Sequence, residues 1–258
     1  MIELLPKFPA FLLIFVRVTS FFLMMPLFSY RTIPAVHKIG LGFFLSWLIF
    51  YTIQPPTLQI DGPFFLLIMK EVMVGLLIGF IAYLILSAIQ IAGGFIDFQL
   101  GFAIANVIDP QTGAQSPLMG QYLYTLGLLI LLSINGHHLL IDGIYNSYHF
   151  IPLDQKWLPF GSHGVLELLL KSFSTMFIIA FQMSIPVVGS LFLVDVALGI
   201  VARTVPQLNI FVVGMPLKII VGFIVIIAVF GVMLSVVSSL FETMLHAMRG
   251  MLELLGGS

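Results

Sequence analysis

The sequence contains no cysteine and few charged residues, and these two shortages exclude several classes of protein. Without cysteine in its 258 residues, the chain has no disulfide framework, no thiolate metal site and no thiol nucleophile. Charged residues make up 8% of the chain, whereas a typical soluble domain has about 25%. The net charge of −1 offers no basic surface for nucleic acid. With a mean hydropathy of +1.16, the chain is predicted to be an integral membrane protein in contact with lipid.

The sequence also lacks the short motifs of common enzyme sites. A nucleophile elbow, a paired-histidine zinc motif and a glycine-rich phosphate loop are all missing. We therefore predict no enzymatic activity, no cofactor and no metal site. His138 and Asp142 are four residues apart on one helical face, but a metal needs more ligands, so a hydrogen-bonded pair is the better interpretation.

Long apolar runs predict an all-α membrane protein. Spanning a bilayer takes roughly 20 helical residues, and four of the six runs have a suitable length. Pro186 cuts the fifth run and is expected to bend it. Bent and broken helices and helical hairpins are therefore expected. The runs cover residues 8–28, 39–53, 72–92, 122–141, 173–202 and 217–240.

The basic residues do not follow the usual asymmetry of membrane proteins. If the six runs are spans, one side holds Lys7, Lys70, Lys156, Lys171 and Arg249, and the other holds Arg31, Lys38, Arg203 and Lys218. Such a balance gives no positive-inside bias. Either the topology is unusual, or some runs face protein instead of lipid.

Two charges interrupt the apolar runs themselves. Arg17 is near the middle of the first run and Asp195 is deep in the fifth. A charge at the centre of a membrane helix costs about 2.5–3.5 kcal/mol, so each must face a partner, a counter-charge or water. A structural ion pair and an ion or substrate pathway both remain open.

The stretch from Leu193 to Lys218 is unusually polar for its depth. We interpret Pro206 and Pro216 as the two ends of a packed connection between helices. Asp195 and Arg203 are about 12 Å apart along a helix, too far to pair directly. Each therefore needs another partner, and we predict that at least one partner belongs to another subunit.

The segment 101–117 reads "GFAIANVIDPQTGAQSP" and has only one ionic group. Asp109-Pro110 starts a turn, and Gly113 can adopt a positive φ. A plain surface loop and a segment folded into an internal space are both consistent with this composition, since non-helical backbone at membrane depth must line a cavity or be buried in protein.

The C-terminal residues 241–258 form an apolar stripe at helical spacing. This pattern predicts a separate amphipathic helix that packs at an interface and does not span the membrane. The stripe consists of Phe241, Met244, Leu245, Met248, Leu252 and Leu255, and Glu242, His246, Arg249 and Glu253 lie on the other side.

Three stretches, in order, resemble the FliR family, the export-gate T component of type III secretion. They read "RVTSFFLMMPLFSYRTIP" (17–34), "GFAIANVIDPQTGAQSP" (101–117) and "LGIVARTVPQLNIFVVGMPLK" (198–218). The last is the specific signature. The resemblance implies a non-enzymatic subunit, present as a single copy in a closed helical pore assembly with several copies of FliP and FliQ. FlhB would be a further partner, and unfolded flagellar proteins would pass through the pore transiently. The location would be the bacterial inner membrane, in the flagellar basal body.

The same resemblance implies roles for regions and residues of this chain. Residues 1–165 would be FliP-like, 166–240 a FliQ-like helical hairpin and 241–258 the C-terminal helix. The plug of the pore would be residues 102–117, with gating residues Phe102, Ile104, Asn106, Ile108, Asp109, Pro110, Gln111 and Gly113. Contacts with neighbouring subunits would bury Arg17, Asp195, Arg203, Pro206, Gln207, Asn209, Phe211, Pro216 and Lys218.

Met24 and Met25 suggest a deformable methionine gasket, although methionines are more often ordinary core residues. An alternative function is a secondary transporter or channel for a small solute or ion, because broken helices with buried charges are typical of transporters.

Overall fold

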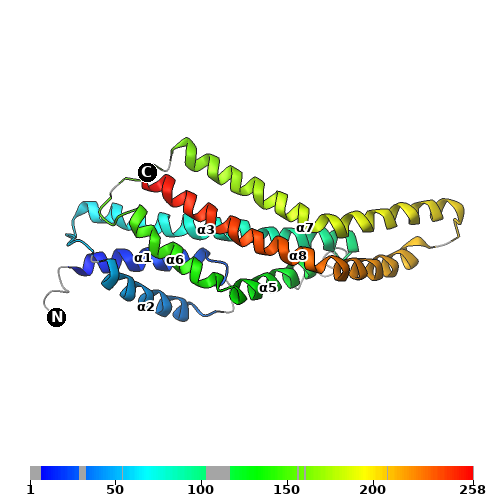
Figure 1. Cartoon of the computed structure of the whole chain (residues 1–258), viewed down its shortest axis with the longest axis horizontal. Coiled ribbons are helices and arrows are strands. Elements are labelled where there is room, and N and C mark those ends of the chain that lie inside the picture. Colours follow the sequence, from blue (N-terminus) through cyan, green and yellow to red (C-terminus); the bar gives the residue numbers. More distant parts are fainter. Residues whose placement is uncertain are drawn as a thin grey trace. The chain divides into compact units, whose positions relative to one another are not determined.

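The computed structural model describes residues 7–28, 33–53, 55–102, 117–155, 157–159, 161–207 and 209–257, without the side chains of Ile210 and Phe211. All regular structure in these ranges is helical, which confirms the all-α prediction (Figure 1). The helices are α1 (Phe8–Met24), α2 (Ala35–Ile53), α3 (Gly62–Leu100), α5 (Leu118–Ser133), α6 (Gly136–Phe150), α7 (His163–Thr204) and α8 (Ile210–Gly256).

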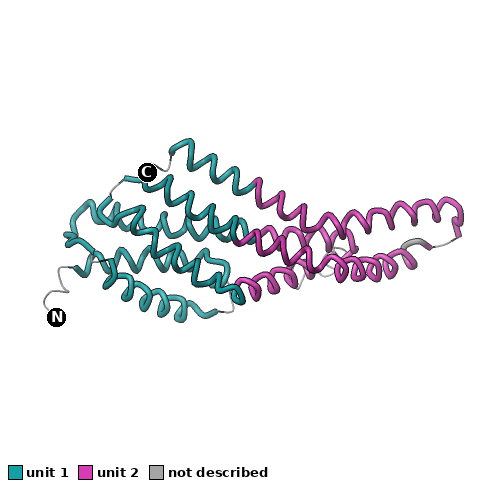
Figure 2. The backbone as a smooth tube through the Cα atoms, viewed as in Figure 1, with its two compact units in different colours: residues 1–86, 132–173, 242–258 teal, residues 87–131, 174–241 magenta. Residues whose placement is uncertain are grey.

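The chain divides into two compact units, each assembled from distant parts of the sequence (Figure 2). Unit 1 comprises residues 1–86, 132–173 and 242–258, and unit 2 comprises residues 87–131 and 174–241. The helices α3, α5, α7 and α8 contribute residues to both units. The stretches of the two units alternate along the sequence, so each unit contains parts of several predicted apolar runs.

Within the described ranges, four helices are long and apolar enough to cross a membrane: α2, α3, α7 and α8. The first predicted run ends early, because α1 stops at Met24, before Pro26, and has 17 residues. The fourth run is broken: α5 and α6 form a pair bent by 74°. Asn135, at the break, has a φ of 57°, the left-handed conformation that an Asn-Gly sequence favours.

In unit 1, aromatic rings join α1 to α2. Phe11 lies edge-to-face against Phe43, Trp47 and Phe50, with ring centroids 5.5–5.9 Å apart. Such edge-to-face pairs are stabilising beyond the area they bury. The outer side of α2 remains exposed, with Phe44 69% exposed.

Glycines bring α1 and α3 into close contact in the same unit. A Cβ added at Gly75 would lie 2.1 Å from Ser20 Oγ and 2.4 Å from the carbonyl of Arg17. One turn further, a Cβ at Gly79 would lie 2.8 Å from Met24 Cβ. This small-xxx-small pattern lets two helix backbones approach closely.

The predicted C-terminal helix is not separate, because α8 runs without interruption from Ile210 to Gly256. No proline or glycine turn stands near residue 240 to end it. Most of its predicted apolar stripe nevertheless packs inside unit 1, where Met244, Met248, Leu252 and Leu255 are buried.

In unit 2, the connection between α7 and α8 is shorter than predicted. It covers residues 205–209, and Pro216 lies inside α8, in its second turn. A proline there removes a single backbone hydrogen bond, which the long helix tolerates. The described residues of the connection are exposed in this chain, so its packing against neighbouring subunits stays a prediction.

Candidate functional site

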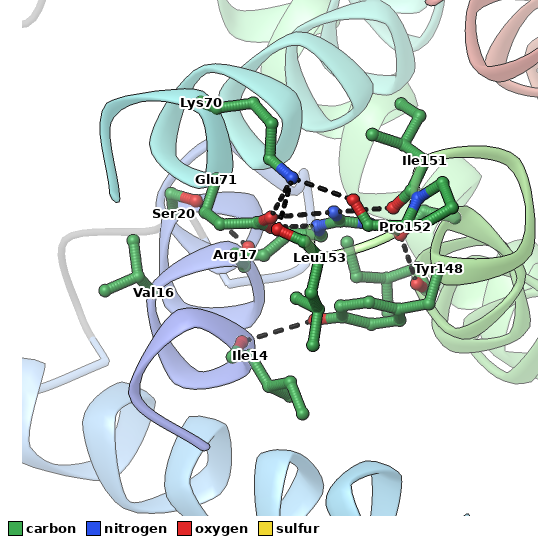
Figure 3. Close-up of polar contacts among 12 residues, drawn as sticks. Ile14, Val16, Arg17, Ser20, Lys70, Glu71, Tyr148, Ile151, Pro152 and Leu153 are labelled. Carbon is green, nitrogen blue, oxygen red and sulfur yellow. Dashed lines mark hydrogen bonds and ion pairs between the residues drawn. The ribbon is translucent and has the colours of Figure 1, made fainter. Parts of the chain in front are cut away.

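A buried ionic cluster lies between α1, α3 and the end of α6 in unit 1 (Figure 3). The Arg17 guanidinium donates to both carboxylate oxygens of Glu71, with Nη2 3.0 Å from Oε1. It also donates to Ser147 Oγ at 3.0 Å and to the carbonyl of Ile151 at 2.9 Å. Arg17 and Glu71 are both 0% exposed. The bidentate geometry is the strongest form of such a pair.

Lys70 completes the cluster from the neighbouring position of α3. Its Nζ donates to the carbonyls of Pro152 at 2.9 Å and Leu153 at 3.1 Å. The same Nζ is 2.7 Å from Glu71 Oε1. Every donor of the ammonium therefore has an acceptor, as burial of a charge requires.

An aromatic ring covers the Arg17 guanidinium. The ring of Tyr148 lies with its centroid 4.1 Å from Cζ, a cation–π contact. The Tyr148 hydroxyl donates to the carbonyl of Ile14 at 3.3 Å. The cluster is thus saturated with partners, and it stabilises unit 1 instead of providing a free acid or base.

This cluster corrects the expectation that a neighbouring subunit buries Arg17. The counter-charge, the hydrogen-bond acceptors and the covering ring all belong to the same chain. Of the two interpretations left open by the sequence, the structural ion pair is the one that applies to Arg17.

A second polar site, in unit 2, joins the end of α3 to the start of α5. The carboxylate of Asp97, 3% exposed, accepts the backbone N–H of Met119 at 2.9 Å and of Gly120 at 3.4 Å. These are unpaired donors of the first helical turn, and Pro117 before them has no capping side chain. Asp97 therefore caps α5 from another helix, where the helix dipole also favours its negative charge.

Close backbone packing accompanies this cap. A Cβ added at Gly93 would lie 2.2 Å from Gly120 Cα and 2.4 Å from its nitrogen. One helical turn on either side of Gly93, Asp97 caps α5 and Ile89 packs against Gly127. Ile89, Gly93 and Asp97, which share one face of α3, thus all contact α5.

The end of α3 is fixed by a glycine. Gly101 has a φ of 87°, a conformation that disfavours residues with a Cβ. The N–H of Phe102 donates to the carbonyl of Asp97 at 3.0 Å, and that of Gly101 to the carbonyl of Phe98 at 3.2 Å. This is a Schellman ending. The two described residues that flank segment 103–116, Phe102 and Pro117, therefore both adjoin well-held helix ends.

A third polar group links α3, α7 and α8 within unit 2. Asp195 Oδ2 accepts a hydrogen bond from Gln99 Nε2 at 2.7 Å and from Lys218 Nζ at 3.0 Å. The Asp195 side chain is 41% exposed and that of Lys218 18%. Asp195 thus has partners in its own chain. It does not pair with Arg203, which agrees with the prediction that the two residues are too far apart along the helix.

The remaining predicted contact residues lie at the connection between α7 and α8. Arg203, Pro206 and Gln207 are exposed. Asn209 caps α8, since its Oδ1 accepts the N–H of Val212 at 3.4 Å. Phe211 is in the first turn of α8, and its side chain lies outside the described part of the structure.

The predicted gasket and plug residues have different outcomes. Met25 is 0% exposed inside unit 1, so it cannot form a gasket, whereas Met24 is 37% exposed. Phe102 is half-buried after α3. The other predicted gating residues lie outside the described residues: Ile104, Asn106, Ile108, Asp109, Pro110, Gln111 and Gly113.

The structure also revises the predicted His138–Asp142 pair. Asp142 Oδ2 instead accepts from Asn146 Nδ2 at 2.9 Å. In the described part of the chain, no group of three or more His, Asp or Glu side chains could hold a metal ion.

Sequence reasoning missed Glu71, Lys70, Asp97 and Gln99. Glu71 and Asp97 stand in or beside an apolar stretch, which is a signal of burial that could have singled them out. Their partners, however, are contributed by other helices, and spacing along the chain does not identify those.

A family model described as bacterial export proteins, family 1, matches residues 8–244. The chain belongs to this family. This match confirms the resemblance to the FliR family that was based on the three stretches of sequence. It also agrees with the apolar helices in assigning the chain to membrane-embedded components of bacterial export.

One relative is similar over nearly the whole chain, and two others are similar over 63–80% of it. The flagellar biosynthetic protein FliR of Bacillus subtilis (strain 168) is 58% identical over 257 residues, 99% of each chain. FliR of Escherichia coli (strain K12) is 30% identical over 207 residues, 80% of this chain and 78% of the relative. The Yop proteins translocation protein T of Yersinia pestis is 31% identical over 164 residues, 63% of this chain and 62% of the relative.

Proposed function

We propose that the chain is a non-enzymatic subunit of the flagellar type III protein export gate. In this proposal it assembles with FliP and FliQ around a pore, contacts FlhB, and lets unfolded flagellar proteins pass. The site of action is the inner membrane, at the flagellar basal body. The observation that carries the proposal is the full-length similarity to a protein named for flagellar biosynthesis.

The exposed apolar faces of the long helices support a subunit role. In the most apolar 18-residue stretch of α7, 11% of the residues are buried within the chain, and in that of α8, 17%. Apolar surface of this extent needs lipid or another protein to cover it. The exposed connection with Arg203 and Gln207 is available to the same neighbours.

The hydrogen bonds at the end of α3 and the start of α5, on either side of segment 103–116, support the proposal of a plug. Asp97 ties the start of α5 to α3, so the residues on either side of the segment are fixed to each other. In this proposal the segment between these two helix ends moves aside for export while the helices stay in place. We propose that residues 102–117 block the pore before export, with the gating residues that the resemblance implies.

The regional assignment belongs to the same proposal. Residues 1–165 would act as the FliP-like part and residues 166–240 as the FliQ-like hairpin, now formed by α7 and most of α8. Arg203, Gln207 and Met24 are its exposed candidates for contact with other subunits.

Deleting residues 106–115 from the assembled gate is expected to make it leak. The deletion leaves the Asp97 cap and the Gly101 ending in place, so the two helix ends keep their partners. Ion conductance across a membrane that contains the assembled gate would measure the effect, and we expect it to rise about tenfold or more over the parent gate.

A gate in which a Gly/Ser sequence of equal length replaces residues 106–115 provides the control for chain length. It should leak less than the deletion and more than the parent. A deletion gate as tight as the parent would contradict the plug. Coupled solute uptake by the chain alone in liposomes would favour the transporter alternative instead.

A further inference from the structure

The last turn of α3, residues 97–101, contacts three other helices of unit 2. Asp97 faces α5, where its carboxylate accepts two backbone N–H groups of the first turn. Gln99 faces α7, where its Nε2 donates to Asp195 Oδ2 at 2.7 Å. Successive residues of a helix are about 100° apart around its axis, so Asp97 and Gln99 point to opposite sides of α3. The turn is therefore bonded to a different helix on each side.

Two further residues of this turn pack against α8. The Leu100 side chain is buried and lies over Gly222, where a Cβ would collide with it. Met215 lies beside Gly101, with its Cε 3.3 Å from the position that a Cβ would take. The backbone hydrogen bonds that end α3 keep the turn from unwinding. A displacement of α7 and α8 in this region therefore moves the whole turn.

The pair of Asp195 and Lys218 lies where the α7–α8 hairpin leaves the packed part of unit 2. The Lys218 Nζ is 2.9 Å from Asp195 Oδ1, so the pair joins the two helices at the residue that α3 binds. Just before the pair, Leu191 of α7 is buried. Beyond it, between residues 196 and 217, Gly214 is the only described residue that is buried. This end of the hairpin extends past the other helices of unit 2 (Figure 2).

We propose that the last turn of α3 couples the position of the α7–α8 hairpin to the Asp97 cap of α5. A displacement of the exposed end, residues 196–217, moves Asp195, which moves the turn through Gln99. Asp97, in the same turn, then changes its hydrogen bonds to the start of α5. The bonds form one continuous network between the two regions. Gln99 is in this sense a positioning residue for the start of α5.

The inference rests on the proposed function only for the source of the displacement, which would be a neighbouring subunit that binds the exposed end of the hairpin. The coupling itself belongs to the single chain. Because coupling between two sites is reciprocal, a change at the start of α5 also changes the hairpin.

Gln99→Leu tests the link, because leucine has a similar size and helix propensity but cannot donate to Asp195. Hydrogen exchange of the two amides that donate to Asp97 measures the cap. We expect exchange about tenfold faster, since a hydrogen bond to a charged group contributes at least that factor. The matched control is Gln182→Leu, at an exposed glutamine of α7, which should leave both amides at the parent rate. Equal rates in the two variants would overturn the proposal.

Asp195→Ala tests whether α7 acts through Gln99. It removes the acceptor of the Gln99 amide and should speed exchange at the same two amides about as much as Gln99→Leu does. The two substitutions together should have no more effect than either alone, since they remove one shared interaction. Effects that multiply would show that Asp195 acts by another route and would contradict the coupling. If Gln99→Leu fails to fold, Asp195→Ala alone still has to speed the exchange.

Exchanging the two side chains separates the link from a general loss of packing. Gln99→Glu places a second carboxylate against Asp195 and should speed exchange about tenfold or more, because like charges side by side are costly. Adding Asp195→Asn restores one amide and one carboxylate beside the ammonium of Lys218. The double variant should return to within about threefold of the parent rate. A double variant that exchanges as fast as Gln99→Glu alone would sink the proposal.

All these measurements use the purified full chain in detergent and need no other subunit. If the variants behave as expected but the chain never assembles with FliP or FliQ, the proposed function fails and the coupling stands. If the chain assembles but every variant exchanges at the parent rate, the coupling fails and the proposed function stands.

Discussion

Replacing Glu71 with glutamine is expected to destabilise the protein by about 3–5 kcal/mol, because it leaves the buried cations of Arg17 and Lys70 without their carboxylate. For a chain of this size, that loss corresponds to a fall of about 10 °C or more in the midpoint of thermal unfolding. Thermal unfolding of the purified chain in detergent measures it. The hydrogen bonds to Ile151, Pro152 and Leu153 remain, but neutral carbonyls do not replace an anion.

The exposed pair Arg249–Glu253 supplies the control. Its side chains are 72% and 44% exposed, and the two residues are one helical turn apart. Glu253→Gln should change stability by less than about 1 kcal/mol, since exposed pairs contribute little. If both substitutions had equally small effects, the buried cluster could not be a main stabilising feature of unit 1.

Gly93→Ala is expected to have the next largest effect. The added methyl group would lie 2.2 Å from a backbone atom of Gly120, and a backbone cannot rotate away as a side chain can. The helices α3 and α5 must separate, which costs about 3 kcal/mol and also pulls the start of α5 from Asp97. Thermal unfolding reports the loss, and faster hydrogen exchange at the amides of Met119 and Gly120 locates it.

Two glycines of α7 make matched controls. A Cβ at Gly189 or Gly199 would meet no described atom within 4 Å. Alanine at these helical positions should stabilise the isolated chain by roughly 0.5–1 kcal/mol, because glycine loses more backbone freedom on folding. Destabilisation by Gly189→Ala equal to that by Gly93→Ala would contradict the close packing of α3 on α5.

Local signals in the sequence predicted the class of fold and several helix ends. The apolar runs indicated helices because each is far longer than a strand, and the stripe at 241–255 indicated which side of the last helix is buried. Where a run crossed Pro26 or the Asn135–Gly136 pair, its length overstated the helix, since local backbone chemistry ends or bends a helix even in apolar sequence.

The polar contacts could be predicted only in part. Hydropathy alone showed that Arg17 and Asp195 need partners. Which residues those are depends on helix packing, and Glu71 is 54 residues from Arg17 along the chain. Pro216 was predicted to end the connection between the helices, but it lies inside α8. A proline often breaks a helix, yet a long helix can lose one hydrogen bond and continue.

Purification of this chain from cells that also express FliP and FliQ tests whether it functions as a subunit of an export gate. Native mass spectrometry of the purified material measures which chains accompany it and in what number. We predict a stable complex that contains one copy of this chain with several copies of the other two. A folded, functional monomer that never co-purifies with either protein would exclude a role as a gate subunit.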